Sequence, residues 1–333
     1  MKDEGSLALG SKKFQDETKR HAYKEKLQKL ITRLIDPGTN LLKEELGIKR
    51  NCPLCNEPPE NTRVVFVKEG FHYLKCRGCT LIYVSPMLKE DSIQEMYEAS
   101  DYAQGWMQVL LNPVEQKFNR PKFEHGLQRI EQIKKQKGGR ILDIGCAVGQ
   151  FLQIARDLNW EVMGVELNKT AREYCQKSGF EVSGELLTDC SFPADSFDAV
   201  SMWDVFEHIP HPRQILRSVN KMLKPEGVLL ILVPNVDSLA ARVMQEKCNM
   251  FLGMSHLNMF NNATLTRLLK EEALTVVEST TIISEVSVIN NYLDYEHPYV
   301  GESDLLNTLF DKINPDYILD NYLGYKLLVY AQK

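Results

Sequence analysis

The sequence predicts an α/β protein with a mainly parallel sheet, helices on both faces of that sheet, and a small zinc-binding module near the N-terminus. From residue 140 onward, short apolar runs typical of strands alternate with longer runs that have the helical period. Such alternation indicates parallel strands joined by crossover helices. Before this region, four cysteines form two Cys-x-x-Cys pairs, a spacing typical of a structural zinc site.

The composition is that of an ordinary globular protein, and it narrows the classes of function. The 333 residues are enough for one large domain with attachments or for two domains. The formal net charge of −5 disfavours sequence-independent binding to nucleic acid, which usually requires a basic stripe. No apolar run approaches the ~20 residues of a membrane span, and residues 1–5 do not start a signal peptide. We therefore expect a cytoplasmic protein without a membrane span.

Residues 1–50 are predicted to form a helical N-terminal extension, and its helical stripe stops at residues 36–38, where aspartate, proline and glycine follow one another. Its apolar residues recur with the helical period: Leu27, Leu30, Ile31, Leu34 and Ile35. Such a stripe either packs against the body of the same chain or binds a partner protein or a second copy.

Residues 51–86 are predicted to form a zinc ribbon. Twenty residues lie between the pair Cys52 and Cys55 and the pair Cys76 and Cys79. Two such pairs fill the four positions of a tetrahedral zinc ion. The residues between the pairs alternate as in a hairpin that turns at residues 68–70. A four-cysteine site leaves no open position, so the zinc is expected to be structural. Free or redox-active cysteines are the alternative.

Residues 87–135 are predicted to be a helical, aromatic-rich connector, with a helix from about Pro121 to residue 135. An aromatic side chain here either fills the core or closes over a ligand. We single out Tyr102 as the candidate for a lid.

Residues 136–333 carry the alternating pattern of the predicted sheet. We expect helices at 149–158, 168–178, with Asn168 as N-cap, and 211–223. The expected strands are 141–145, 161–166, 181–183, 198–203, 228–233, 274–283 and 325–331. A turn at residues 224–227 precedes the fifth strand, and an insertion at about 287–322 separates the last two.

The turn after the first strand of this region predicts a nucleotide-type ligand. Asp143 is followed by glycines at Gly145 and Gly149, and a helix begins directly after them. A dinucleotide fingerprint would need a third glycine where Gln150 stands. Glu166, at the end of the next strand, has the place of a carboxylate that binds ribose hydroxyls.

Five segments together resemble class I S-adenosylmethionine-dependent methyltransferases. They are Asp143-x-Gly-x-x-x-Gly149, Glu166, Phe192-Pro-x-x-Ser-Phe-Asp198, Trp203-Asp-Val-Phe-Glu-His-Ile-Pro210 and Leu223-Lys-Pro-Glu-Gly227. The resemblance covers about residues 120–333 and implies a Rossmann-like seven-stranded sheet. The core of the chain is similar to ubiquinone-biosynthesis-type O-methyltransferases. Ala147 and Glu226 depart from the family, which often has glycine at both places.

The resemblance implies a set of cofactor contacts at the ends of the strands. These are Asp143, Gly145, Ala147 and Gly149 at the amino-acid end of S-adenosylmethionine, Glu166 at the ribose, Leu167 and Leu186 at the adenine, and Trp203 and Asp204 at the methionine part and the acceptor.

The chemistry implied is in-line displacement of a methyl group onto a small molecule, most simply at a hydroxyl oxygen whose proton must be removed. Histidine suits that task, and His208 and His256 lie in loops on the acceptor side. His211, between two prolines, is expected to be structural. A ribosomal or transfer RNA methyltransferase with a zinc ribbon is one alternative, and a degenerate methyltransferase that binds a partner protein is another.

Overall fold

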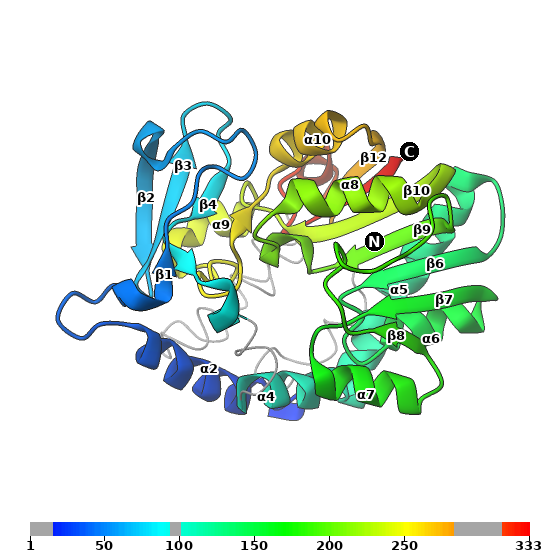
Figure 1. Ribbon diagram of the computed structural model, residues 1–333, viewed down its shortest axis with the longest axis horizontal. Helices are drawn as coiled ribbons and strands as arrows, with labels where there is room; N and C mark the ends of the chain where they lie inside the picture. The colour runs from blue at the N-terminus through cyan, green and yellow to red at the C-terminus, as the bar shows by residue number, and fades with distance from the viewer. Residues whose placement is uncertain (1–15, 94–100, 283–314) are drawn as a thin grey trace.

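The computed structural model describes residues 16–93, 101–282 and 315–333 of the chain. Two larger sheets organise these residues, one of seven strands and one of four, and a two-stranded sheet lies beside them (Figure 1). No helix of the described segments combines the length and the apolar character that crossing a bilayer requires.

The seven-stranded sheet has the order β12-β13-β10-β9-β6-β7-β8. Its strands are β6 (Gly139–Ile144), β7 (Trp160–Val165), β8 (Glu181–Ser183), β9 (Phe197–Trp203), β10 (Leu223–Pro234), β12 (Thr275–Ile282) and β13 (Lys326–Gln332). Strands β6 to β10 pair in parallel, and β13 pairs antiparallel with both of its neighbours. The predicted Rossmann-like sheet, which has seven strands and is mainly parallel, is confirmed.

Helices cover both faces of this sheet because its central strands are apolar on both sides. Leu229 and Ile231 of β10 pack toward one pair of helices, whereas Leu230 between them packs toward the other pair. The first pair is α8 (Pro212–Met222) with α10 (Asn262–Glu271), and the second is α5 (Pro113–Lys134) with α6 (Gln150–Asp157) (Figure 1). Helix α7 (Lys169–Lys177) begins at Asn168, whose side chain accepts a hydrogen bond from the Ala171 amide, as predicted for an N-cap.

Two predicted boundaries were wrong. Helix α5 begins at Pro113 and not near Pro121, because the Asn112 side chain caps it and a proline is well suited to the first helical position. Residues 224–227 are not a turn before the fifth strand. They form an irregular stretch inside β10, which already pairs with β9 at Leu223.

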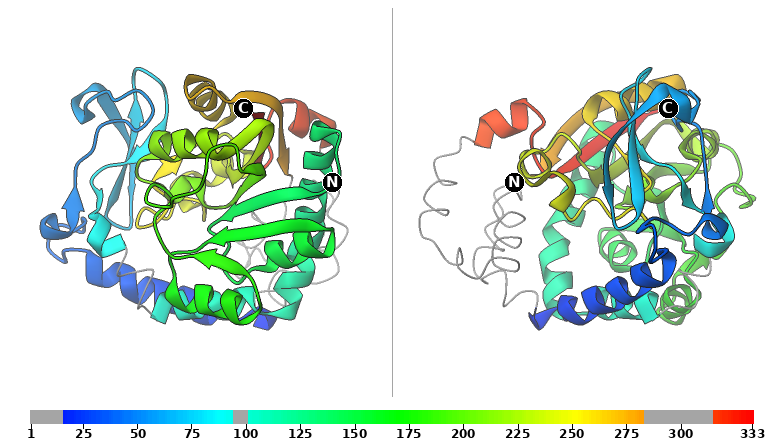
Figure 2. Two further views of the ribbon diagram at one scale, coloured as in Figure 1. Left: turned by 45° about the vertical axis from the view of Figure 1, so that its right-hand side comes forward. Right: turned by 90° about the vertical axis from the view of Figure 1, so that its left-hand side faces the viewer.

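The four-stranded sheet has the order β11-β4-β3-β2, and only three of its strands come from the cysteine-containing segment. The predicted hairpin is present as β2 (Thr62–Lys68) and β3 (Phe71–Cys76), followed by β4 (Ile82–Val84). The fourth strand, β11 (Asn258–Met259), comes from the region after β10 and pairs antiparallel with β4. The yellow part of the chain, which carries this strand, lies beside the blue and cyan strands (Figure 2). The sequence analysis did not predict this joining of the two regions.

The apolar stripe of the N-terminal helix α2 (Arg20–Leu34) packs against other parts of the same chain. Ile31 is buried, and its neighbours in the stripe pack into the core formed by the four-stranded sheet and residues 240–259. The Tyr23 ring packs at a tilt against Trp106 of helix α4 (Asp101–Leu110). The remaining short elements are η1 (Glu44–Leu46), β1 (Gly47–Ile48), η2 (Pro59–Asn61), β5 (Met87–Leu88), η3 (Phe206–His208), α9 (Leu239–Met244), η4 (Gln245–Lys247) and α13 (Pro315–Asp320).

Two regions singled out in the sequence lie outside the described residues. The side chain of Tyr102, the predicted lid residue, is not described, and neither is most of the insertion 287–322.

Candidate functional site

The glycine turn between β6 and α6 is built as the sequence predicts. The amides of Gly145 and Cys146 both donate to the carbonyl oxygen of Val165, at 2.7 and 3.1 Å, which binds the turn to the end of β7. Gly145 has a φ of 73°, and a Cβ there would lie 2.5 Å from Cγ2 of Val205. Gly149, with φ of 75°, is the N-cap of α6. Both positions therefore require glycine for conformation or space.

Ala147, the departure from glycine in this turn, also has a left-handed backbone. Its φ is 48°, a conformation that costs an L-residue roughly 1–2 kcal/mol. Its amide donates to Oε2 of Glu166 at 2.9 Å, so the hydrogen bond to the neighbouring loop helps to hold the strained backbone.

Glu166 connects the turn to the loop after β7. Its second oxygen, Oε1, accepts from the amide of Asn168 at 2.7 Å. A carboxylate offers about four acceptor positions, so about two remain for the hydroxyls of a ribose. Burial raises the pKa of Glu166, and the amides of Asn168 and Ala147 oppose that rise.

Two leucines in the loops after β7 and β8 are exposed although they are large and apolar. Leu167 is 40% exposed and Leu186 is 53% exposed. Arg172 holds the two loops together, since it donates to the carbonyl oxygens of Glu166 and Leu167 and its guanidinium lies against Gly184. Exposed leucines on fixed loops beside a carboxylate suit a flat apolar group such as an adenine.

Asp143 lies buried at the end of β6. The hydroxyl of Ser201 donates to its Oδ1 at 2.7 Å. Burial raises the pKa of Asp143 to about 8, and the hydrogen bond from Ser201 limits the rise.

Trp203 and Asp204 end β9 in two different environments. The Trp203 ring packs against Phe123 and Phe151, with ring centroids 4.9 and 5.4 Å apart, which are the contacts of a core side chain. Asp204 has a φ of 56° and forms an ion pair with Lys326 on β13. Burial would raise the pKa of Asp204, but the charge of Lys326 outweighs it and the pKa is lowered.

The two candidate histidines lie against each other. The rings of His208 and His256 are perpendicular, with centroids 4.7 Å apart. Nδ1 of His256 lies 2.6 Å from the carbonyl oxygen of Met250. Burial lowers the pKa of His208 well below its ordinary value and that of His256 to about 4. His211, expected from the sequence to be structural, is exposed, and its Nε2 lies 3.1 Å from Oε1 of Glu90.

The sequence analysis missed Glu207, which the structure places beside the histidines. Its side chain is 1% exposed and lies 3.8 Å from Nε2 of His208. Neither carboxylate oxygen has a hydrogen-bond partner in another residue that the structure describes. Burial and the nearby charge of Asp204 raise the pKa of Glu207 to about 8. An acid directly before a histidine, in a loop that follows a parallel strand, was the available signal.

The four predicted zinc ligands come together. Sγ of Cys52 lies 3.4 Å from that of Cys79, Sγ of Cys55 lies 3.4 Å from that of Cys76, and all four lie within 4.8 Å of one another. A zinc ion with Zn–S bonds of about 2.3 Å requires sulfurs about 3.8 Å apart, so the four thiols fit that ion.

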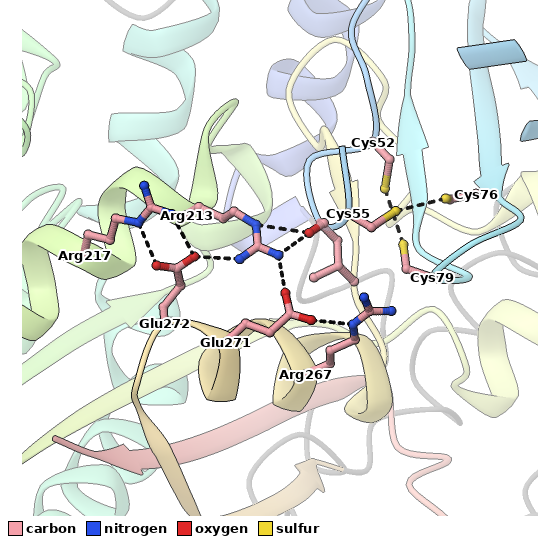
Figure 3. Close-up of polar contacts among 10 residues, drawn as sticks. Cys52, Cys55, Cys76, Cys79, Arg213, Arg217, Arg267, Glu271 and Glu272 are labelled. Atoms are coloured by element: carbon pink, nitrogen blue, oxygen red, sulfur yellow. Dashed lines mark hydrogen bonds and ion pairs between the residues drawn. The ribbon is translucent and has the colours of Figure 1, made fainter. Parts of the chain in front are cut away.

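Arginine side chains join this cysteine cluster to helices α8 and α10 (Figure 3). Arg213 donates from Nε to the carbonyl oxygen of Leu54, between the first two cysteines, at 3.0 Å, and from its terminal nitrogens to Glu271 and Glu272. Arg217 also pairs with Glu272, at 2.8 Å. The ribbon is therefore attached to the helices of the large sheet.

Arg50 attaches the ribbon to the histidine loops. Its guanidinium donates to the carbonyl oxygens of Pro210 and Leu257, at 3.1 and 2.7 Å. The amide of Leu257 donates in turn to the carbonyl oxygen of Glu207 at 2.9 Å. The loops that carry His208 and His256 are thus held by the N-terminal module.

Comparisons with known proteins agree with this geometry. Residues 116–279 match the family model described as a methyltransferase domain. The chain is 32% identical over 128 residues to a ubiquinone biosynthesis O-methyltransferase of Xanthomonas axonopodis pv. citri, an alignment that covers 36% of this chain and 49% of the relative. It is 32% identical over 111 residues to the enzyme of the same name from Nitrosococcus oceani, covering 30% and 46%. The chain spans about half the length of these curated relatives.

Among solved structures, the chain is similar to a SAM dependent methyltransferase from Archaeoglobus fulgidus. The two are 17% identical with a TM-score of 0.49, and the match covers 70% of this chain and all of the other.

Proposed function

We propose, from the class I S-adenosylmethionine-dependent methyltransferase domain that this chain carries, that the protein transfers a methyl group to a hydroxyl oxygen of a small molecule. The match to ubiquinone biosynthesis O-methyltransferases supports oxygen as the acceptor atom. The net charge of −5 supports a small molecule over a nucleic acid.

The observation that carries the proposal is the pairing of the glycine turn with Glu166. The glycines of the turn leave its backbone, at the start of α6, open to a ligand because they carry no side chains. Glu166 keeps acceptor positions beyond those that the amides of Ala147 and Asn168 use. In our proposal Leu167 and Leu186 enclose the adenine, and Asp143 holds the turn.

Bound S-adenosylmethionine would supply a sulfonium methyl group, whose carbon–sulfur bond breaks, leaving its electron pair on sulfur, as the acceptor oxygen bonds to the carbon. The protein has to align the acceptor and take the proton of its hydroxyl. His208 and His256 are neutral near pH 7, because burial lowers the pKa of both, so each can accept a proton. Asp204, at the end of β9, would orient the acceptor with Lys326 beside it.

We further propose that the cysteine cluster holds one structural zinc ion. Its four sulfurs would fill the coordination shell, so its task is to fix the ribbon and, through Arg50 and β11, the histidine loops. Elemental analysis is expected to find this zinc, and a folded protein without metal at the four cysteines would contradict the assignment.

Calorimetric titration with S-adenosylmethionine tests the cofactor assignment. Glu166→Ala removes hydrogen bonds to a charged group, each of which contributes roughly 1.5–3 kcal/mol, so the affinity should fall about 100-fold. Glu161→Ala is the matched control, since this glutamate lies on β7, the strand that Glu166 directly follows, with its side chain 71% exposed. Unchanged affinity in a folded Glu166→Ala variant would refute the proposal.

A further inference from the structure

A buried carboxylate and two imidazoles converge beyond the end of β9. One carboxylate oxygen of Glu207 and one nitrogen each of His208 and His256 lie within 4.8 Å of one another. Helix η3 supplies the first two residues, and the loop before β11 supplies the third. The cluster is separate from the four cysteines, which are the other such group among the described residues.

The residues described around Glu207 offer its carboxylate no hydrogen-bond donor. The side chain is 1% exposed, and neither oxygen accepts a hydrogen bond from another residue that the structure describes. The nearby Lys326 is engaged with Asp204. Native proteins rarely leave a buried carboxylate without a partner, so such a group requires an explanation.

Backbone carbonyls orient the two imidazoles. Nδ1 of His256 donates to the carbonyl oxygen of Met250, which leaves the lone pair on Nε2. The His208 ring also hydrogen-bonds to the backbone of Ser255. Histidines that bind metals commonly donate their other ring N–H to a backbone carbonyl or carboxylate, which fixes the tautomer.

We propose that Glu207, His208 and His256 bind one divalent transition-metal ion, and that the acceptor's hydroxyl oxygen occupies an open coordination position on it. Two histidines and one glutamate are a donor set of catalytic zinc sites, in which the fourth position stays open. The role toward the acceptor rests on the proposed function, whereas binding of the ion does not. The ion would lower the pKa of the bound hydroxyl, as zinc lowers that of water. Because the ion would occupy the free lone pair of each imidazole, the two histidines would then act as its ligands and not as the proton acceptors named above, and the released proton would pass to solvent.

Zinc titration of the full-length protein, with the ribbon site already filled, tests the proposal. Calorimetry should show one further site, and elemental analysis two zinc ions per chain. Glu207→Gln keeps the shape of the side chain but removes its charge, and should weaken the further site by at least about 100-fold, more than a lost outer contact costs. His256→Gln should do the same, while both variants keep the ribbon zinc. His211→Gln, which replaces an exposed histidine nearby, should bind as the wild type does.

A wild-type protein that takes up only one zinc would overturn the proposal. So would a further site that survives both Glu207→Gln and His256→Gln. S-adenosylmethionine titrations of the same samples separate this failure from that of the proposed function. Cofactor binding without a second zinc refutes only the metal site, whereas absent cofactor binding refutes the methyltransferase assignment whatever the zinc content.

Discussion

Two buried acids near opposite ends of β9 have opposite surroundings. Asp198, at its start, accepts hydrogen bonds from Lys134, Lys224 and the Arg140 amide at 2.7–2.9 Å. Burial would raise its pKa, but these donors outweigh it and lower the pKa to about 2. Glu207, four residues past the end, has no comparable donor, and its pKa is raised to about 8.

The difference indicates that the two edges of the sheet, the one where β9 begins and the one where it ends, have different roles. At the edge where β9 begins, donors from α5, β6 and β10 meet on Asp198 and connect these elements. At the opposite edge, burial raises the pKa of Asp143 and Glu166 as well as that of Glu207. Ligands of parallel α/β sheets bind beyond the carboxyl ends of the strands. We therefore interpret the three acids whose pKa is raised as binding groups and Asp198 as a structural one.

Asp198→Asn should have the largest effect, and the effect should be on stability. The substitution leaves Lys134, whose side chain is 7% exposed, without its anionic partner. Breaking a buried pair on one side costs about 3–5 kcal/mol, measurable by denaturant unfolding. Asp195→Asn, which breaks the ion pair between the exposed Asp195 and Lys333, should cost under about 1 kcal/mol. Equal losses in the two variants would remove the distinction between the edges.

Glu207→Gln should show the reverse pattern. Methyl transfer should fall about 100-fold, equivalent to about 2.7 kcal/mol, because the proposed ion and the bound hydroxyl lose a ligand. With zinc at the cysteine cluster only, the free energy of unfolding should change by less than about 1 kcal/mol, since no hydrogen bond to another described residue is lost. Turnover assays and denaturant unfolding of the same preparation check both. A stability loss as large as that of Asp198→Asn would make Glu207 structural.

The pH dependence of unfolding should differ in sign between the two edges. The pKa of Asp198 is lowered from 3.8 to about 2, so its contribution of about 2 kcal/mol is present above about pH 4 and is lost as the pH falls toward 2. The pKa of Asp143 is raised from 3.8 to about 8, so the folded cofactor-free protein loses stability as the pH rises between these values.

The test is to measure the free energy of unfolding of the wild type, Asp143→Asn and Asp198→Asn from pH 2 to 8. Asp143→Asn should become more stable relative to the wild type as the pH rises from about 4 to 8. The deficit of Asp198→Asn should grow only between about pH 2 and 4. Parallel curves for all three proteins would contradict the assigned shifts.

The sheet, the cysteine cluster and the cofactor turn could be predicted from the sequence because each depends on local patterns. Strands and helices have their own periods, and Cys-x-x-Cys pairs and glycine turns depend on residues close together in the chain. The N-cap at Asn168 belongs to the same class.

Features that depend on distant contacts could not be predicted. Strand β11 has two residues and therefore no period, and its pairing with β4 joins segments about 175 positions apart. Arg50 contacts residues 160 and 207 positions further along the chain. The role of Glu207 could not be predicted for the same reason. Only the folded loops show that its carboxylate is buried and accepts no hydrogen bond from another described residue.

The smallest expected effects compare the two departures from glycine, one at each edge. Ala147 and Glu226 both have left-handed backbones, with φ of 48° and 61°. Glycine relieves roughly 1–2 kcal/mol of strain but costs roughly 0.5–1 kcal/mol in unfolded-chain entropy. Ala147→Gly and Glu226→Gly should therefore each raise the free energy of unfolding by about 0.5 kcal/mol. Only Ala147→Gly should alter the affinity for S-adenosylmethionine, by less than about 3-fold, because of the two residues only Ala147 lies in the proposed cofactor turn, where its backbone amide donates to Glu166. Calorimetry showing an equal change in Glu226→Gly would mean that the edge where β9 begins also takes part in binding.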